Sequence, residues 1–432
     1  MSSERKVITL DDAGVALLDC VHKTPEEDPE GSFRYVAIPQ MSNGRIRIDE
    51  SRRISSSDFD EWTKKAAPQS HDVVLSRRCN PGETAYVAPG ERFALGQNLV
   101  LLRADGVSIF PPFLRWLVRG PAWWEQIQKN LNVGAVFDSL KCRDVPSFEL
   151  PVPSLDEQRT IAGVLGALDD KIEQNRCTAQ TLEKLARAIF RAWFVDFEPV
   201  KAKAAGATSF PSMPQAVFDA LPIRFVNSTV GLVPDGWEVK AIGDVVTVKG
   251  GATPRTREAE FWDDGTHCWA TPKDMSRLAH PVLLDTERRI TDAGVESISS
   301  GVLPVGTVLM SSRAPVGYLA IAGVPTAINQ GFIAMVCDGP LPPIFVLNWA
   351  MNSMDTIKAH ASGTTFPEIS KKTFRPLPII NPDAQCVSAY QHITDPLFGL
   401  LVASIKESGR LAEVRDYLLP QLLSGDVRVS HG

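Results

Sequence analysis

Apolar positions repeat with a helical period through a long segment that begins near Ser154. The pattern Ser154-Leu155-Asp156-Glu157 is typical of a capping box at the start of a helix. Apolar or small residues then follow in steps of three and four, which predicts a heptad seam and a coiled coil. The alternative is a long amphipathic helix that packs only on its own domain. The seam positions are Ile161, Leu165, Leu168, Ile172, Asn175, Ala179, Leu182, Ala186, Ile189 and Trp193.

A second segment, residues 383 to about 423, carries a weaker version of the same pattern. Because proline lacks a backbone N–H and clashes with the preceding helical turn, Pro396 predicts a kink or a late start of this helix. We expect the two helices to pair antiparallel, because that arrangement places a domain at each end of the pair. The apolar positions of the second helix are Tyr390, Leu397, Leu401, Leu411, Leu418 and Leu422.

The two helices are part of a longer internal repeat. Leu150-Pro151 followed by Asp156-x-Gln158 recurs as Leu377-Pro378 followed by Asp383-x-Gln385. A repeat that keeps its order predicts two similar globular units, each followed by a similar helix. The matched segments further upstream are residues 73–77 with 308–313, Gln97-Asn98 with Asn329-Gln330, and residues 35–41 with 268–275.

Short strand-like runs bounded by Gly, Pro and Asn predict that both units are mixed α/β (α+β). The expected architecture is two similar mixed domains separated by a pair of long antiparallel coiled-coil helices, with a pseudo-two-fold internal repeat. The expected boundaries are a first domain at residues 1–153, a first helix at 154–197, a linker rich in Ala, Pro and Ser at 198–235, a second domain at 236–380, a second helix at 381–425 and a tail at 426–432.

The composition is that of a soluble globular protein with two or three domains, at 432 residues, 44% apolar and 22% charged. Seven cysteines without a C-x-x-C spacing favour a reducing cytoplasm and argue against a zinc site or a disulfide framework. The start of the chain lacks an apolar signal segment, so we expect a cytoplasmic protein. Residues 314–337 are uncharged and long enough to span a bilayer, but a turn at Gly323-Val324-Pro325 predicts two strands instead.

The formal net charge of −6 does not favour a uniformly basic nucleic-acid binder, yet arginine and lysine gather in local clusters. Reading of DNA in the major groove uses Arg or Lys on guanine and Asn or Gln on adenine, while Ser, Thr and basic groups bind phosphates. For each candidate the alternative is a solvated charge or a turn residue. The candidates are Arg45, Arg47, Arg77, Arg78, Gln97 and Asn98 in the first domain, and Thr253, Arg255, Lys273, Arg313, Gln330, Thr364, Thr365, Lys371 and Lys372 in the second. Arg77 and Arg313 rank first because each lies at the end of a matched strand.

Motifs of DNA-acting enzymes are missing from the chain. The sequence contains no phosphate-binding G-x-x-x-x-G-K-[ST] motif, no Asn/Asp-Pro-Pro-aromatic motif and no G-x-G-x-x-G after a strand. Asp235 and Glu238 stand too close together to converge on one metal from separate strands, as a metal-dependent nuclease requires. The histidines show no metal or triad spacing. We therefore expect no catalytic residue and no metal site in this chain.

Several runs around the two helices closely resemble Type I restriction-modification specificity subunits. Residues 150–159, 161–175 and 192–200 resemble the first conserved region of that family, and residues 418–426 resemble the end of its second. Residues 236–240, 250–254 and 270–275 resemble the opening of a target recognition domain. The chain departs from the pattern where the second helix has Ala384 and Cys386 in place of Glu157 and Arg159, and where the first domain lacks a clear Gly-Gly-x-Thr-Pro.

The resemblance implies that each recognition domain reads one half of a bipartite, asymmetric DNA site. The helices would set the spacer and dock two methyltransferase subunits that methylate adenine, and restriction subunits that join the complex would translocate and cleave unmodified DNA. S-adenosylmethionine, ATP and magnesium would then be bound by these partners and not by this chain. Residues 193–197 are either core residues or part of the methyltransferase docking surface. Two other hypotheses are a non-catalytic coiled-coil protein adaptor and a self-sufficient enzyme, which the missing motifs disfavour.

Overall fold

The computed structural model describes residues 5–134, 138–313, 315–363 and 367–428. The chain divides into two compact units, residues 1–173 with 409–432 (unit 1) and residues 174–408 (unit 2). Two long helices, α4 (Leu155–Phe194) and α13 (Ala384–Ser424), each contribute residues to both units. Across the described residues, no helix combines the length and apolarity that crossing a bilayer requires.

Unit 1 is built on a six-stranded sheet in the order β2-β10-β7-β8-β5-β4, with a three-stranded sheet in the order β6-β3-β9. β1 and β11 form a separate antiparallel pair. The strands are β1 (Lys6–Thr9), β2 (Val15–Asp19), β3 (Phe33–Val36), β4 (Met41–Ser42), β5 (Arg45–Ile46), β6 (Arg52–Ile54), β7 (Val73–Ser76), β8 (Thr84–Tyr86), β9 (Ala94–Leu95), β10 (Leu99–Ala104) and β11 (Glu149–Val152). The helices are η1 (Ile38–Gln40), η2 (Ile48–Glu50), α1 (Ser56–Thr63), α2 (Pro111–Leu117), α3 (Pro121–Asn130) and η3 (Val145–Ser147).

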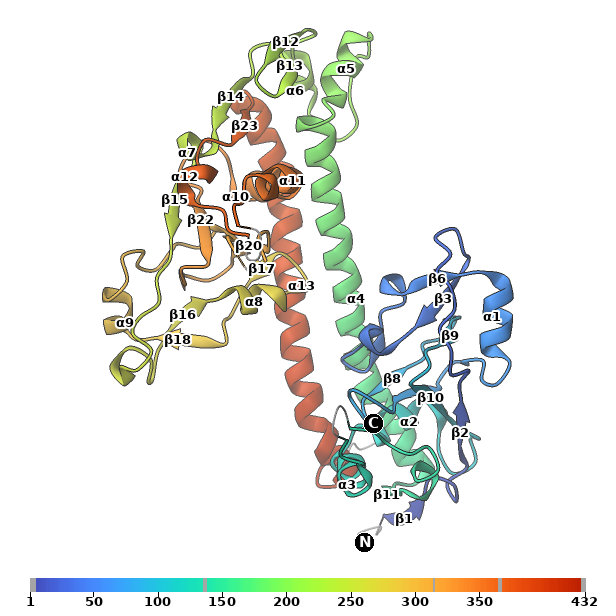
Figure 1. Ribbon diagram of the computed structural model, residues 1–432. Helices are drawn as coiled ribbons and strands as arrows, with labels where there is room; N and C mark the ends of the chain where they lie inside the picture. The colour runs from blue at the N-terminus through green and yellow to red at the C-terminus, as the bar shows by residue number, and fades with distance from the viewer. Residues whose placement is uncertain (1–4, 135–137, 314, 364–366, 429–432) are drawn as a thin grey trace. The chain divides into compact units, whose positions relative to one another are not determined.

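Unit 2 has two corresponding sheets, a five-stranded sheet in the order β15-β22-β19-β20-β17 and a three-stranded sheet in the order β18-β16-β21, and two antiparallel pairs, β14 with β23 and β12 with β13. Its strands are β12 (Phe225–Ser228), β13 (Gly231–Pro234), β14 (Glu238–Ala241), β15 (Thr247–Gly250), β16 (His267–Ala270), β17 (Val282–Leu283), β18 (Arg288–Ile290), β19 (Val308–Ser311), β20 (Leu319–Ala322), β21 (Thr326–Ile328), β22 (Phe332–Val336) and β23 (Pro378–Asn381). Its helices are α5 (Glu198–Ala204), α6 (Gln215–Ala220), α7 (Ile242–Val245), η4 (Ala259–Phe261), α8 (Pro272–Ser276), α9 (Asp292–Glu296), α10 (Pro343–Asn352), α11 (Met354–Ala359) and α12 (Lys371–Phe374). Within unit 2, Figure 1 shows β16 and β18 at one end and the β12–β13 hairpin at the other.

The strand pairing confirms the internal repeat. In each unit the small sheet has a central strand, β3 or β16, that pairs antiparallel on one side and parallel on the other. In each large sheet a short strand, β5 or β17, runs parallel to its neighbour at the corresponding place. The uncharged stretch forms β20 and β21 on either side of Gly323, as expected, and also a third strand, β22, that was not expected.

The long helices pack antiparallel inside each unit. In unit 1, Ile161 and Leu165 of α4 share a core with Leu419 and Leu422 of α13. In unit 2, the Asn175 side chain donates to the Glu407 carboxylate at 2.7 Å. Residues near the start of α4 therefore contact residues near the end of α13, and residues further along α4 contact earlier residues of α13. Of the expected seam, Leu165 and Ala179 are fully buried, whereas most other leucine and isoleucine positions are only partly buried.

Local capping fixes where both helices begin. The Ser154 hydroxyl accepts from the Glu157 amide while the Glu157 carboxylate accepts from the Ser154 amide, which is the predicted capping box. Asp383 accepts from the Cys386 amide at 2.8 Å, and α13 starts at Ala384. The predicted late start is therefore wrong. Pro396 and His392, whose carbonyl loses its partner to the proline, both lie on the exposed face, where water can satisfy that carbonyl.

Candidate nucleic-acid interface

Strand register brings three segments of unit 1 to one sheet edge. Leu99, the first residue of β10, pairs with Ser76, the last of β7, and Val100 pairs with Asp19, the last of β2. The residues that follow β7 and precede β10 therefore lie together. The Arg77 amide donates to the Asn98 carbonyl at 3.0 Å, and the Arg77 guanidinium lies 3.4 Å from the Gln97 carbonyl. This edge joins Arg77, Gln97 and Asn98.

A hollow of about 410 Å³ opens beside this edge. Tyr35, Ile38 and Leu99 form part of its apolar lining, and Gln97 and Asn98 border it. Arg52 also lines the hollow, with its guanidinium 5.9 Å from the centre of the Tyr35 ring. Among the described residues, the side-chain amides of Gln97 and Asn98 have no hydrogen-bond partner, so both are available to a ligand. Arg52 was not among the predicted contacts, although its place in an arginine pair was visible in the sequence.

The structure places Arg45 and Arg47 against helix α4 instead. The Arg45 side chain donates to Asp169 at 2.8 Å and to Asp170 at 2.7 Å, and Arg47 lies 3.5 Å from Glu173. Both arginines thus anchor the edge of the unit 1 sheet to the helix, which leaves their guanidinium groups engaged. Arg78 is exposed, and its backbone forms an isolated bridge with Ser139.

Asp169 is the centre of a buried charge cluster that the sequence analysis missed. The residue is 2% exposed and accepts from Arg45, from Arg115 of α2 and, at 2.8 Å, from Arg415 of α13. Burial alone would raise the pKa of Asp169, but Arg115, Arg45 and Arg415 together hold it below its usual value. The cluster therefore fastens the unit 1 sheet to both long helices.

In unit 2 the Gly-Gly-x-Thr-Pro run packs on the turn that contains Asn329 and Gln330. The Ala252 amide donates to the Ile328 carbonyl at 3.0 Å, and the Thr253 hydroxyl donates to the Gln330 side chain. The Asn329 side chain accepts from the Gly331 amide at 2.8 Å. The side-chain oxygens of Asn329 and Gln330 thus already accept hydrogen bonds, unlike those of Gln97 and Asn98 in unit 1.

The other predicted residues of unit 2 lie on its surface in different settings. Lys273 pairs with Glu287 at 2.9 Å and Arg255 pairs with Glu258 at 2.9 Å, but all four side chains remain substantially exposed. Arg313 bridges Glu368 through its backbone, and the closest side-chain distance is 3.9 Å. Lys371 lies over Gly250 and Lys372 is exposed at the start of α12. Thr364 and Thr365 lie outside the described residues.

Gly251 allows the close approach of this run to the turn. A Cβ atom at Gly251 would lie 2.1 Å from the Ile328 carbonyl oxygen and 2.2 Å from the Asn329 carbonyl oxygen. We expect Gly251→Ala to destabilise unit 2 by about 2–3 kcal/mol, because backbone atoms would have to move. Urea unfolding measures the effect.

Gly399→Ala is the matched control for this substitution. Gly399 lies within α13 with no atom near an added Cβ, so alanine should stabilise the protein by about 0.5–1 kcal/mol. Equal effects of the two substitutions would contradict the close approach at Gly251.

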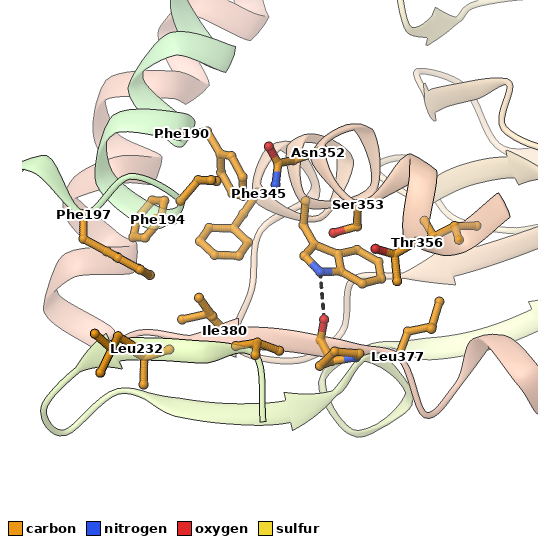
Figure 2. Close-up of a pocket in the computed structure, with 16 residues that line it drawn as sticks. Phe190, Phe194, Phe197, Leu232, Phe345, Asn352, Ser353, Thr356, Leu377 and Ile380 are labelled. Atoms are coloured by element: carbon orange, nitrogen blue, oxygen red, sulfur yellow. Dashed lines mark hydrogen bonds between the residues drawn. The ribbon is translucent and has the colours of Figure 1, made fainter. Parts of the chain in front are cut away.

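The end of α4 forms one side of an apolar pocket of about 260 Å³ in unit 2. Figure 2 shows Phe190, Phe194 and Phe197 on one side of it and Leu377 on the other. The indole of Trp349 donates to the Pro378 carbonyl at 3.1 Å, as the dashed line marks. The opening includes Leu232, which is 61% exposed. Trp193 and Phe194 are buried, so core packing accounts for these two aromatic residues.

In the two units, different kinds of side chain hold the α/β domain against the long helices. Arg115-Trp116 of α2 and Asn348-Trp349 of α10 occupy corresponding positions of the internal repeat. Arg115 donates to Asp169, whereas Asn348 donates at 3.3 Å to the hydroxyl of Tyr390, which packs against the rings of Phe194 and Phe345. Unit 1 thus uses a buried ion cluster where unit 2 uses an aromatic cluster.

Asp19, Cys20 and His22 come close enough to suggest a metal site. Burial, and next the charge of Asp19, raise the pKa of the Cys20 thiol to about 11, so metal binding there would have to release the thiol proton. The Arg77 guanidinium also lies 3.5 Å from His22. The like charge of this arginine disfavours a cation at these three residues.

Comparisons with known proteins agree with these features. The profile described as "Type I restriction modification DNA specificity domain" matches residues 19–184 and 234–393. The Type I restriction enzyme HindI specificity subunit of Haemophilus influenzae is 26% identical over 409 residues, covering 84% of this chain and 88% of that protein. The MjaIX specificity subunit of Methanocaldococcus jannaschii is 36% identical over 164 residues, covering 38% of each chain. A crystal structure of a Type I restriction-modification S subunit from M. genitalium shares the fold, with a TM-score of 0.60, 15% identity and coverage of 98% of this chain and 97% of that one.

Proposed function

The chain belongs to the family of Type I restriction-modification DNA specificity proteins, and we propose that its two units read the two halves of a bipartite, asymmetric DNA site. The observation that supports this most is the repeated edge. In both units an arginine follows a matched strand, β7 or β19, and an Asn/Gln pair lies just before the strand that pairs with it, β10 or β22. Because the flanking side chains and their partners differ between the units, each edge would read a different sequence.

In unit 1 the available groups match the chemistry of base edges. Guanidinium groups recognise guanine and carboxamides recognise adenine in the major groove. Arg77 supplies the first, and Gln97 and Asn98 supply the second at the same edge. Exposed basic residues such as Arg78 would bind phosphates, which position the protein without reading sequence.

The chemistry on DNA would belong to partner subunits. Two methyltransferase subunits would bind S-adenosylmethionine and methylate adenine, and restriction subunits would use ATP and magnesium to translocate and cleave unmodified DNA. The missing nucleotide-binding and methyltransferase motifs in this chain support that division. This chain would then supply sequence recognition alone.

The apolar pocket at the end of α4 is a candidate docking site for a methyltransferase subunit. Leu232 and Val230 of the β12–β13 hairpin are exposed beside it. Exposed apolar side chains gathered at a pocket are typical of a protein-interaction surface. We expect Leu232→Asp to abolish or strongly reduce copurification with the methyltransferase subunit, because it would bury a charge in the interface. Val107→Asp, at an apolar residue of unit 1 that is 72% exposed, is the control. Equal copurification of the two variants would contradict docking at this pocket.

The helix pair would set the distance between the two half-sites. α4 has 40 residues, which correspond to about 60 Å at about 1.5 Å per residue. One turn of B-DNA rises about 34 Å, so this length is comparable to between one and two turns. Whole helical turns inserted into both helices are expected to lengthen the unread spacer, as read from a methylation map. An unchanged spacer would contradict the role of the helices as a ruler.

Reconstitution with the methyltransferase encoded beside this chain tests the proposed function. The complex should methylate adenines at one bipartite sequence, which methylation mapping of treated genomic DNA identifies. The methyltransferase alone is the control and should show no such sequence preference. A complex that forms but never gives site-specific methylation would instead support the protein-adaptor hypothesis.

A further inference from the structure

The small sheets of both units place an arginine opposite an aromatic residue at the same register position. In unit 1, Arg52 of β6 pairs with Tyr35 of β3, the central strand of that sheet. In unit 2, Arg288 of β18 pairs with Trp269 of β16, again the central strand. Because residues directly opposite each other in an antiparallel pair lie on the same face of the sheet, each arginine lies beside its aromatic partner.

Both guanidinium groups lie against aromatic rings. The guanidinium carbon of Arg52 is 5.9 Å from the centre of the Tyr35 ring. That of Arg288 is 3.5 Å from the centre of the Trp262 ring and 5.6 Å from the centre of the Trp269 ring. A guanidinium that is attracted to the face of a ring loses less freedom when its N–H groups bind a ligand, because its plane is already restricted.

The N–H groups of both arginines are available to a ligand. Arg52 and Arg288 are exposed, and among the described residues neither side chain forms an ion pair or donates a hydrogen bond. The next arginine of each strand differs, because Arg53 donates to a backbone carbonyl at 3.4 Å and Arg289 pairs with Asp285 at 2.8 Å. Side chains alternate along a strand, so these neighbours lie on the other face of the sheet. Each small sheet therefore has one engaged arginine and one with open donors.

In unit 1 the ring beside the open arginine also holds the turn of the reading edge. The Tyr35 hydroxyl accepts from the backbone amide of Gln97 at 3.3 Å. Arg52 lines the same hollow as Gln97 and Asn98. The guanidinium of Arg52 therefore lies beside the two carboxamides that are available at this edge.

In unit 2 the corresponding contacts are made by two tryptophans. The indole of Trp262 donates to the Arg255 carbonyl at 3.1 Å. The indole of Trp269 donates to the Ala252 carbonyl at 3.2 Å. The threonine between these two carbonyls donates to the side chain of Gln330. The rings beneath the open arginine of unit 2 thus hold the run that packs on its own Asn/Gln turn.

A guanidinium with a restricted plane matches the edge of guanine. Guanine presents two acceptors, O6 and N7, in the major groove, and two parallel N–H groups of one arginine can donate to both. A phosphate can also be bound by a flexible point charge such as a lysine, so it does not require a guanidinium that lies on a ring. The stacking and the neighbouring carboxamides therefore favour a base as the ligand.

We propose that Arg52 and Arg288 are specificity-determining residues, each of which reads a guanine in the half-site of its own unit. This inference rests on the proposed function. It adds to each reading edge a base position other than the one read by Arg77 or Arg313. The two units share the position of this arginine, whereas the rings beside it differ.

The test compares methylation maps of the wild-type reconstituted complex with those of Arg52→Ala and Arg288→Ala. Each variant should relax the preference for guanine at one position, and the two positions should lie in different half-sites. Binding to a duplex with the wild-type site should weaken about 10- to 100-fold in each variant. Arg52→Lys and Arg288→Lys keep the charge but lose the planar pair of donors, so they should relax the same two positions.

Arg53→Ala and Arg289→Ala are the matched controls, because each removes the same charge from the next position of the same strand. Both should keep the wild-type preference at every position. A duplex in which the guanine assigned to Arg52 is replaced by deazaguanine, which lacks the N7 acceptor, provides a second measurement. It should weaken binding of the wild-type complex and should not weaken binding of Arg52→Ala any further.

Two results would overturn the inference and leave the proposed function intact. One is an unchanged base preference in Arg52→Ala or in Arg288→Ala. The other is binding that weakens equally for all sequences, with the salt dependence lowered by about one phosphate contact, because these arginines would then bind phosphates. A wild-type complex without any site-specific methylation would overturn the proposed function itself.

Discussion

Replacement of Asp169 by asparagine is expected to destabilise unit 1 by about 3–5 kcal/mol, the usual cost of leaving buried charges without their partner. Arg45 would keep Asp170, and Arg415 would keep Asp416. Arg115 would lose its carboxylate partner and keep its contacts with Tyr86 and Trp116, while its side chain is 6% exposed. Most of the loss should therefore come from Arg115. Hydrogen exchange of β7 and β10 in urea, compared with β19 and β22, would assign the loss to unit 1.

Asp170→Asn is the control for this substitution. Asp170 also binds Arg45, but its side chain is 73% exposed, so its loss should cost no more than about 1 kcal/mol. Replacing Asp169 and Arg115 together by leucine and methionine should recover part of the stability, because the uncompensated charge is then removed. A double variant as unstable as Asp169→Asn would contradict this explanation.

The same cluster makes the stability of unit 1 sensitive to acid. The pKa of Asp169 is lowered in the folded protein, so its contribution to the stability of unit 1 is complete above the pKa of the unfolded chain, about 4. That contribution is lost as the pH falls through the lower folded value. In Asp169→Asn, the free energy of unfolding of unit 1 should no longer fall over this part of the acidic range.

Arg77→Ala is expected to weaken binding of the complex to its site by about 10- to 100-fold, the range of one bidentate arginine–guanine contact. Methylation mapping should show a relaxed preference in one half-site and an unchanged preference in the other. Arg313→Ala should give the complementary result, because it stands at the same place in unit 2. These two variants together test whether each unit reads one half-site.

Arg47→Ala is the control for the arginine variants. Arg47 was also a candidate in the sequence, ranked below Arg77, and the structure places it 3.5 Å from Glu173 of α4. Its loss should leave the base preference at every position of the site unchanged. If Arg47→Ala relaxed the preference and Arg77→Ala did not, the assignment of the reading edge would be wrong.

Local signals made much of the fold predictable from the sequence. The capping box at Ser154 and Glu157 is a four-residue pattern, and the structure has its hydrogen bonds. The repeat predicted corresponding strands because the run ending in Arg77 and its match ending in Arg313 share one apolar pattern, and the structure has β7 and β19 there. The late start expected at Pro396 is wrong because a proline costs less on an exposed helix face, where water can satisfy the carbonyl that it leaves without a partner.

Long-range partners could not be found in the same way. Asp169 and Arg415 are 246 positions apart, and a search for apolar seam positions passes over a charged pair. Opposite charges at facing positions of the two antiparallel helices, Asp169 and Arg415, are the sequence signal that would have predicted this pair. Arg45 shows the same limit, because nothing near it in the chain indicates that its partners are Asp169 and Asp170.

The unlike attachments of the two units restrict how new specificities can arise by recombination. A first domain carries Arg115 and needs the carboxylate of Asp169, whereas a second domain carries Asn348 and needs the aromatic surface around Tyr390. A first domain transplanted to the second position would bring the guanidinium of Arg115 against the rings of Phe194, Phe345 and Tyr390 in place of the buried Asp169 carboxylate. Genetic exchange should therefore succeed between domains of the same position in different chains, and fail between the two positions of one chain.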